Sequence, residues 1–150
     1  YGLKSVSLRY GNVYGPRQRK DGEAGVVAIF AGAMLDGQTP RINGDGNQTR
    51  DYVFVHDVVR ANMAASERDL EGVYNVGTGV ETSVNELFAE LRHAMGFDRD
   101  AEHGPAKPGE QMRSVLDATK VRTEGGLPPF VTLRDGFAET VAWLRESTKR

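Results

Sequence analysis

Short apolar runs alternate along the chain with longer stretches in which apolar residues recur every three or four positions. The short runs are rich in Val, Ile, Tyr and Phe and favour strands, whereas the longer periodic stretches favour helices. We expect strands over residues 6–10, 41–43, 51–55, 73–76 and 113–116, and helices over residues 25–36, 57–67, 84–95, 117–125 and 132–147. This alternation predicts an α/β fold.

Capping signals sharpen some of these boundaries. Ser83 and Glu86 have the spacing of a capping box at the start of the helix over 84–95, and Gly96 follows its end. We expect Asp57 to act as the N-cap of the helix over 57–67. Two segments, 11–18 and 102–112, are broken by Gly and Pro and are predicted to be loops.

The strand over residues 6–10 alternates little between apolar and polar positions. Such a strand is buried only if neighbours cover both of its faces. We therefore interpret the chain as a piece of a longer protein, and the alternative is a small domain whose first strand lies at its end.

The composition excludes several classes of function. The 150 residues suffice for about one domain, with 39% apolar and 27% charged residues and a net charge of -2. This balance predicts neither nucleic acid nor an anionic membrane as a partner, and no apolar run approaches the ~20 residues of a membrane span.

Cysteine is absent, which fits a cytoplasmic protein. The three histidines lack metal-site spacing, so we expect no metal.

Arg50 is the first candidate for binding a ligand. It follows the polar turn GDGN and precedes an apolar strand. A guanidinium can bind two phosphate oxygens at once, which suits a diphosphate. An ion pair with Asp51 or Asp57 is the alternative.

Other candidates lie in neighbouring loops. Tyr10 and Asn12 follow a strand end, where ligands bind in open α/β sheets, although both could simply pack or complete a turn. Lys107 could supply a second cation and Glu110 could accept sugar hydroxyls, unless both are solvated loop charges. Asn43 adjoins the GDG turn and could contact a base or stabilise the turn.

Two further features carry weaker signals. The turn Gly77–Gly79 could cradle a phosphate, but without a following Lys it favours a tight strand-to-helix turn. Arg113 could also reach a phosphate.

Together these segments resemble a known family. The runs LRYGNVYGPRQ, INGDGNQTRDYVFVHDVVRAN, YNVGTGVETSVNEL and PGEQMRSVLDATK are similar, in order and spacing, to the NAD-dependent epimerase/dehydratase family of extended short-chain dehydrogenases. The similarity is strongest to its UDP-glucose 4-epimerase-like members and covers nearly the whole chain.

The resemblance implies a C-terminal part of that fold, with late strands of a Rossmann sheet and a small α/β substrate-binding domain. Residues 1–150 would form the sugar-nucleotide-binding part. The family's dinucleotide-binding turn, catalytic Ser/Thr and Tyr-x-x-x-Lys pair are absent from the sequence, so no catalytic residue is assigned and the chain alone is expected to be inactive.

The resemblance also implies site residues. Tyr10 and Gly11 match positions near the nicotinamide of NAD, and Gly11, often aromatic in relatives, would leave room there. The expected substrate-binding residues are Asn12 and Arg50 for the diphosphate, Lys107 as its second cation, Arg41 and Asn43 for the base, and Glu110 for the ribose.

The activity implied for the parent enzyme is epimerisation by transient oxidation at the sugar C4, with a nucleotide-diphosphate sugar, a UDP-sugar, as substrate. The alternatives are a 4,6-dehydratase, a decarboxylase, a reductase or a non-catalytic nucleotide-sugar-binding domain. The family is often homodimeric, but the helices used for dimerisation lie upstream, so these residues do not argue for a dimer.

Overall fold

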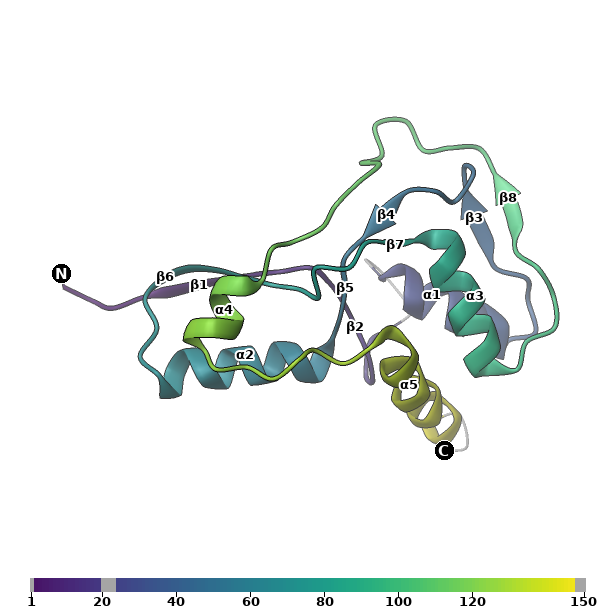
Figure 1. The fold of residues 1–150 in the computed structure, drawn as a ribbon. Coiled ribbons are helices and arrows are strands. Elements are labelled where there is room, and N and C mark those ends of the chain that lie inside the picture. The colour runs from purple at the N-terminus through teal and green to yellow at the C-terminus, as the bar shows by residue number, and fades with distance from the viewer. Residues whose placement is uncertain (1, 20–23, 148–150) are drawn as a thin grey trace.

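The computed structural model describes residues 2–19 and 24–147 and has the predicted α/β character. The molecule is elongated, and its elements form two groups, each built around its own apolar cluster (Figure 1). This division agrees with the expectation of late Rossmann strands joined to a smaller α/β domain.

The first group is built on a pair of parallel strands, β1 (Val6–Tyr10) and β6 (Gly72–Val76). Helices α2 (Val55–Glu67) and α4 (Thr119–Glu124) contact this pair. The buried residues between them are Ala61, Tyr74, Val76, Ala118 and Val121.

The second group contains three helices and three short strand pairs. Its helices are α1 (Val26–Leu35), α3 (Val84–Met95) and α5 (Leu133–Ser147). Its strand pairs are β2 (Asn12–Tyr14) with β5 (Tyr52–Phe54), β3 (Arg41–Asn43) with β8 (Glu102–Gly104), both parallel, and β4 (Thr49–Arg50) with β7 (Thr82–Ser83), antiparallel. Aromatic side chains dominate its core, where Tyr14 packs edge-on against Phe137 and Phe30 against Phe88.

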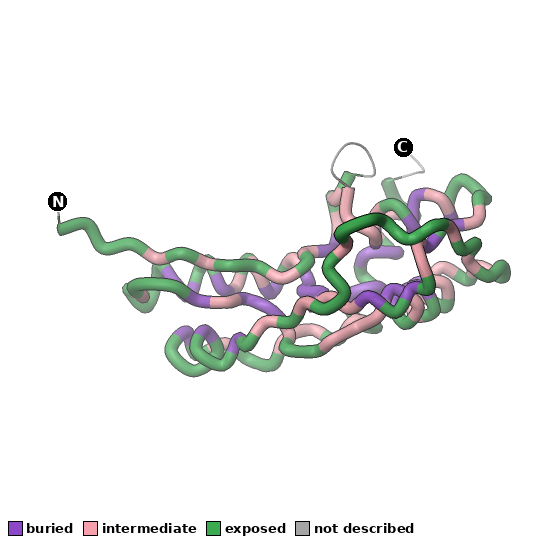
Figure 2. Tube along the Cα trace, turned by 90° about the horizontal axis from the view of Figure 1, so that it is seen from above, coloured by how far each residue is buried: buried purple, intermediate pink, exposed green. Residues whose placement is uncertain are grey.

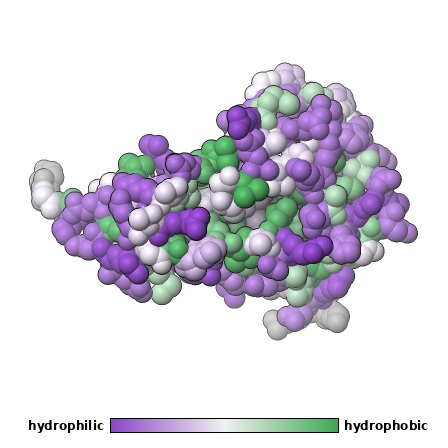
Figure 3. All heavy atoms as spheres, viewed as in Figure 1, coloured by the Kyte–Doolittle hydropathy of each residue, from purple (hydrophilic) through white to green (hydrophobic). Residues whose placement is uncertain are grey.

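Strand β1 pairs with β6 along one edge only within the part of the chain that the structure describes. Tyr10 remains 43% exposed and Val73 on β6 44% exposed. The backbone near the N-terminus is exposed (Figure 2), and hydrophobic atoms gather in the middle of one face of the molecule (Figure 3). The neighbours that would bury both faces of this strand are therefore not among the described residues.

Helix α3 forms as its sequence pattern predicts. The Ser83 hydroxyl accepts a hydrogen bond from the Glu86 amide at 3.1 Å, and the Glu86 carboxylate accepts one from the Ser83 amide at 2.7 Å. Gly96 ends the helix in the left-handed conformation, with φ 65°. The helix buries its periodic apolar positions Val84, Leu87, Phe88 and Leu91.

Three predictions about the extended segments are wrong. The predicted loop 11–18 contains strand β2, the predicted loop 102–112 begins with strand β8, and residues 113–116 form no strand but a single bridge between Thr49 and Arg113. Strands β2 and β8 are three residues long and pair with partners far away in the sequence. The two-residue strands β4 and β7 were not predicted either. Local turn signals carry no information about such distant partners.

The prediction that Asp57 caps α2 is also wrong. The helix begins at Val55, and its N-cap residue is Phe54. Asp57 lies in the first turn, fully buried, and its carboxylate pairs with Arg60 and accepts a hydrogen bond from the Val131 amide at 2.9 Å. Asp57 therefore fixes the segment that leads into α5 rather than the start of α2.

The carboxylate of Asp51 connects the two groups of elements. Asp51 is 1% exposed, and its side chain accepts hydrogen bonds from the Thr78 amide and hydroxyl at 2.8 and 2.7 Å, from the Gly79 amide at 3.0 Å and from the Leu116 amide at 3.2 Å. A Cβ on Gly77 would lie 2.4 Å from this carboxylate, so only glycine allows the approach.

We predict that Asp51→Asn lowers the free energy of unfolding by roughly 2–3 kcal/mol. The substitution replaces one acceptor oxygen with a donor that faces buried N–H groups, and buried donors without acceptors are costly. Urea denaturation would measure the change. The matched control is Asp98→Asn, which alters an exposed aspartate; equal midpoints for the two variants would contradict the prediction.

Candidate functional site

A cavity of about 340 Å³ opens in the second group of elements. Its volume lies within the usual range of small-molecule sites. All six predicted substrate-binding residues line it, although they come from β2, β3, β4 and the connection after β8: Asn12, Arg41, Asn43, Arg50, Lys107 and Glu110.

The remaining lining is mostly apolar and was not predicted. It comes chiefly from the first turns of α1, with smaller contributions from β3, β5 and α3. These additional residues include Val26, Ile29, Phe30, Ile42, Tyr52 and Val84. Among the described residues, the cavity therefore combines an apolar wall with three cationic side chains and one carboxylate, which favours a ligand that has both an apolar part and negative charge.

Arg50 is held close to the cavity wall. Its side chain is 18% exposed, one guanidinium nitrogen donates a hydrogen bond to the Thr49 carbonyl at 2.7 Å, and the other lies 3.7 Å from the Glu110 carboxylate. The ion pairs with Asp51 or Asp57 that the sequence left open do not form. Both carboxylates are satisfied elsewhere, so the charge of Arg50 faces the cavity.

Lys107 and Glu110 reach the cavity from the long connection between β8 and α4. The Glu110 amide donates to the Lys107 carbonyl at 3.2 Å, and Gly109 between them has φ 76°. This turn places both side chains on the same cavity, where the Glu110 side chain is 27% exposed. Lys107 is exposed, whereas Glu110 is partly buried beside Arg50.

The two predicted base-contacting residues lie on β3. The Asn43 carbonyl accepts a hydrogen bond from the Gln48 side chain at 3.1 Å. Arg41 lies across β8, because a Cβ on Gly104 would meet its guanidinium at 2.2 Å. Both residues line the cavity.

Tyr52 is a cavity residue that the sequence analysis missed. It is 6% exposed, and burial raises the pKa of its hydroxyl to about 12, with Glu110 adding to the shift and Arg50 opposing it. The hydroxyl is therefore protonated at neutral pH and can donate a hydrogen bond. The sequence did contain a signal that Tyr52 faces the cavity. Residues two apart in an extended segment share a face, and Tyr52 is two positions from Arg50.

The predicted cofactor residues lie outside this cavity. Tyr10 ends β1, and its hydroxyl exchanges hydrogen bonds with the Asn62 side chain on α2 at 3.0 and 3.2 Å. A Cβ on Gly11 would lie 2.7 Å from the Asp51 carbonyl. The missing side chain of Gly11 therefore makes room for the neighbouring backbone at Asp51.

Two alternative phosphate contacts are not supported. The amides of Thr78 and Gly79 donate to Asp51, so the Gly77–Gly79 turn is structural, as the sequence favoured. Arg113 is 74% exposed, binds Glu81 and does not line the cavity.

Residues 2–19 and 24–147 contain no cluster of three or more metal-ligating side chains. No helix in these same ranges is both long and apolar enough to cross a membrane.

Comparison with known proteins identifies the chain's relatives. The pattern of the NAD dependent epimerase/dehydratase family matches residues 1–77. The chain is 47% identical over 150 residues to UDP-glucose 4-epimerase of Mycolicibacterium smegmatis, covering 99% of the chain and 48% of that protein. It is 35% identical to dTDP-glucose 4,6-dehydratase of Streptomyces niveus, covering 98% of the chain and 44% of that protein.

A solved structure shows the same arrangement. UDP-glucose 4-epimerase of Thermotoga maritima, determined with UDP-glucose, superimposes with a TM-score of 0.92 at 48% identity, covering 99% of the chain and 48% of that structure. The chain spans about half the length of the relatives it matches.

We predict that Tyr52→Phe reduces the loss of stability at alkaline pH. Because the folded-state pKa of Tyr52 is about 12 and the unfolded value is about 10, its stabilising contribution is complete below about pH 10 and disappears as the pH rises through about 12. The free energy of unfolding should therefore fall less steeply in the variant over this interval, as urea denaturation at stepped pH would show.

Burial raises the pKa of Tyr14 as well, so some alkaline loss should persist in this variant. Tyr10→Phe is the matched control, because it removes a hydroxyl from a tyrosine that is 43% exposed. Identical alkaline profiles for the original chain and Tyr52→Phe would contradict the assignment.

Proposed function

The chain belongs to the NAD-dependent epimerase/dehydratase family, and from this premise we propose that it forms the nucleotide-sugar-binding part of a nucleotide-sugar epimerase of the UDP-glucose 4-epimerase type. The observation that carries the proposal is the cavity, which gathers all six of the expected substrate-binding residues from distant parts of the chain. Relatives named as UDP-glucose 4-epimerases support the same reaction class.

The cavity chemistry suits a nucleoside diphosphate. Arg50 and Lys107 supply positive charge for the diphosphate, and the guanidinium of Arg50 can bind two oxygens at once whereas the ammonium of Lys107 acts as a point charge. Asn12 and the protonated hydroxyl of Tyr52 add hydrogen-bond donors on the same wall.

The nucleoside would occupy the less charged part of the cavity. The apolar side chains of α1, such as Val26 and Phe30, offer a surface for a base, with Arg41 and Asn43 as polar partners at its edge. Glu110 can accept hydrogen bonds from ribose hydroxyls. On binding, a diphosphate would compete with Glu110 for Arg50 and leave its carboxylate to the ribose.

Among the described residues, NAD would find a contact at Tyr10 rather than a binding site for its phosphates. Tyr10 lies at the carboxyl end of β1, where dinucleotides bind in open sheets, but its hydroxyl is bonded to Asn62 and Gly11 faces Asp51. Bound NAD would supply the hydride-transfer chemistry at the sugar C4. In this proposal the chain's own residues bind and orient the nucleotide sugar.

Orientation of this kind is a substantial part of catalysis. Holding a substrate in a reactive geometry can lower a barrier by roughly 7 kcal/mol or more in favourable cases. Fixing the diphosphate at Arg50 and Lys107 would leave the sugar as the free end of the ligand.

Related reactions are the second candidate. Dehydratases and decarboxylases also match nearly the whole chain, at 32–36% identity, whereas the UDP-glucose 4-epimerase of Mycolicibacterium smegmatis matches at 47%. The higher identity favours the epimerase. A non-catalytic nucleotide-sugar-binding domain would use the same cavity.

We predict that Arg50→Ala weakens UDP binding by roughly 10- to 100-fold, which is the expected effect of losing a charge-assisted hydrogen-bonding group. Uridine binding should change little, because uridine has no phosphate. Isothermal titration calorimetry with the two ligands would measure the difference.

Arg9→Ala is the matched control, since it removes an exposed cation on β1 outside the cavity. Equal UDP affinities for Arg50→Ala and the original chain would refute the phosphate role. Absence of UDP binding by the original chain would refute the proposed function.

We also predict that the 150-residue chain has no epimerase activity on UDP-glucose, because no Tyr-x-x-x-Lys pair occurs in its sequence. A coupled assay with added NAD would test this, using a complete UDP-glucose 4-epimerase as the positive control. Turnover by the chain would show that another residue acts as the base.

A further inference from the structure

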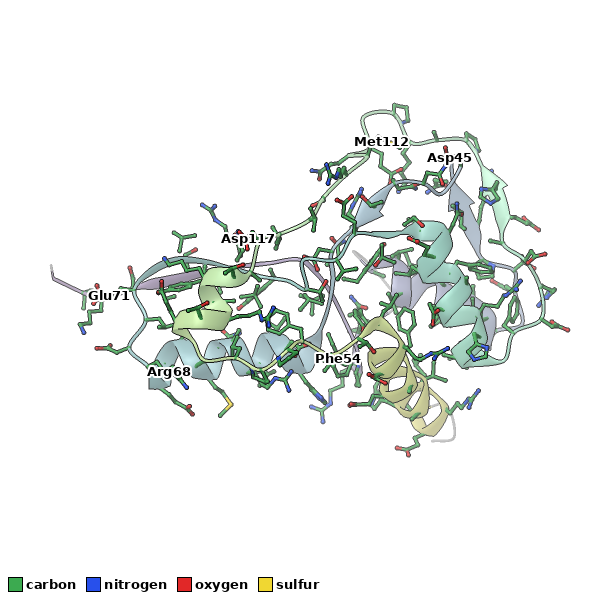
Figure 4. All side chains as sticks on the ribbon, viewed as in Figure 1. Asp45, Phe54, Arg68, Glu71, Met112 and Asp117 are labelled. Carbon is green, nitrogen blue, oxygen red and sulfur yellow. The ribbon has the colours of Figure 1, made fainter. Side chains whose placement is uncertain are left out.

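The segment between Gly104 and Asp117, residues 105–116, is here called the strap. It leaves the end of β8, passes over β3 and β4, and descends to α4 (Figure 1). Met112 lies high on it, and Asp117 follows its lower end (Figure 4). The strap is irregular and mostly exposed, yet it carries Lys107 and Glu110 to the cavity.

The strap has little internal support. Within residues 105–116, all of which the structure describes, one backbone hydrogen bond forms, from the Glu110 amide to the Lys107 carbonyl. Ordering such a segment costs roughly 1–2 kcal/mol of conformational entropy per residue. The position of its two charged side chains must therefore be set where the strap is attached to the rest of the molecule.

One attachment is made at the start of the strap by the backbone. Strand β8 pairs with β3, and the Gly44 amide donates to the Gly104 carbonyl at 2.9 Å. The strap therefore begins at the edge of the cavity.

A second attachment is made at Thr49 on β4, and the Leu116 amide at the end of the strap donates to Asp51 at 3.2 Å. The Thr49 amide donates to the Met112 carbonyl at 2.9 Å, and the Thr49 carbonyl accepts from the Ser114 amide at 3.2 Å. Arg113 is the strap residue opposite Thr49 in this bridge. Thr49 adjoins Arg50, so the attachment lies beside the cavity cation.

Glu81 joins the two sides of this second attachment. One carboxylate oxygen accepts hydrogen bonds from the Arg113 guanidinium, with Nε at 2.8 Å, and the other accepts from the Thr49 hydroxyl at 3.1 Å. Both partners lower the pKa of Glu81, which keeps it ionised. The side chain of Glu81 is 29% exposed, whereas that of Arg113 is 74% exposed.

We propose that Glu81 is a positioning residue for the ligand cavity: by holding Arg113 and Thr49 together it fixes the strap, and thereby keeps Lys107 and Glu110 facing the ligand. Glu81 itself does not line the cavity. The inference rests on the proposed function for its ligand, but the anchoring of the strap can be measured without any ligand.

The first test is amide hydrogen exchange of the ligand-free chain with Glu81→Gln, which removes the charge and keeps the size. Exchange of the hydrogen-bonded amides of Thr49, Glu110 and Ser114 should become faster, while exchange in the core of α3 stays the same. Asp100→Asn is the matched control, because it removes one partner of another ion pair, Arg92–Asp100, that lies outside the cavity. Unchanged exchange in the strap of Glu81→Gln would overturn the anchoring.

The second test is a thermodynamic cycle on UDP binding, measured by calorimetry. Glu81→Gln should weaken UDP binding about two- to fivefold, the effect of losing one partly exposed ion pair. In the chain that also carries Lys107→Ala and Glu110→Ala, the same substitution should cause no further loss, because the strap then presents no charge to the ligand.

An equal loss in both backgrounds would overturn the inference, since Glu81 would then act through general stability. Thr49→Val removes only the hydroxyl that Glu81 binds, and it should weaken UDP binding in the same background-dependent way. If the unaltered chain does not bind UDP, the proposed function fails together with the ligand part of this inference, whereas the exchange experiment still decides whether Glu81 anchors the strap.

Discussion

The carboxylate of Asp51 is buried between the two groups of elements, and the geometry of the cavity depends on how it is satisfied. A buried anion costs several kcal/mol unless donors surround it. Here the donors are Thr78 and Gly79 in the turn after β6 and Leu116 at the end of the strap. The side chain of Asp51 therefore fixes both segments to the extended segment that carries Arg50. The glycine at position 77 follows from the same requirement, since a side chain there would displace the carboxylate.

Alternation along this extended segment separates structure from binding. Arg50 and Tyr52 face the cavity, while Asp51 between them faces the turn and the strap. The Asp51 carboxylate is hydrogen-bonded on the opposite side of the segment, so the charge of Arg50 remains available to the cavity. Among the described residues, Arg50 forms one ion pair there, with Glu110 at 3.7 Å. The stability of this region and its positive charge therefore arise from neighbouring residues that point in opposite directions.

The sequence predicted best those features that local signals determine. The helix from Val84 to Met95 follows from its capping box, its apolar spacing and Gly96, all contained in one stretch of chain. Strands β2 and β8 were missed because their partners are 40 and 61 residues away. Asp57 shows the same limit. Its carboxylate accepts a hydrogen bond from the amide of Val131, which is distant in the sequence, so no local motif around Asp57 predicts this contact.

The site was predicted through resemblance to a family more than through local chemistry. All of its residues except Arg41 had an ordinary alternative role, and only the fold shows that six of them share one cavity. The strap explains why Lys107 and Glu110 looked like solvated charges, since their neighbours are exposed and their position is fixed by contacts at Gly104, Thr49 and Asp51. A long irregular segment can therefore carry well-placed charges without secondary structure of its own, provided that both of its ends are attached to strands that form the cavity.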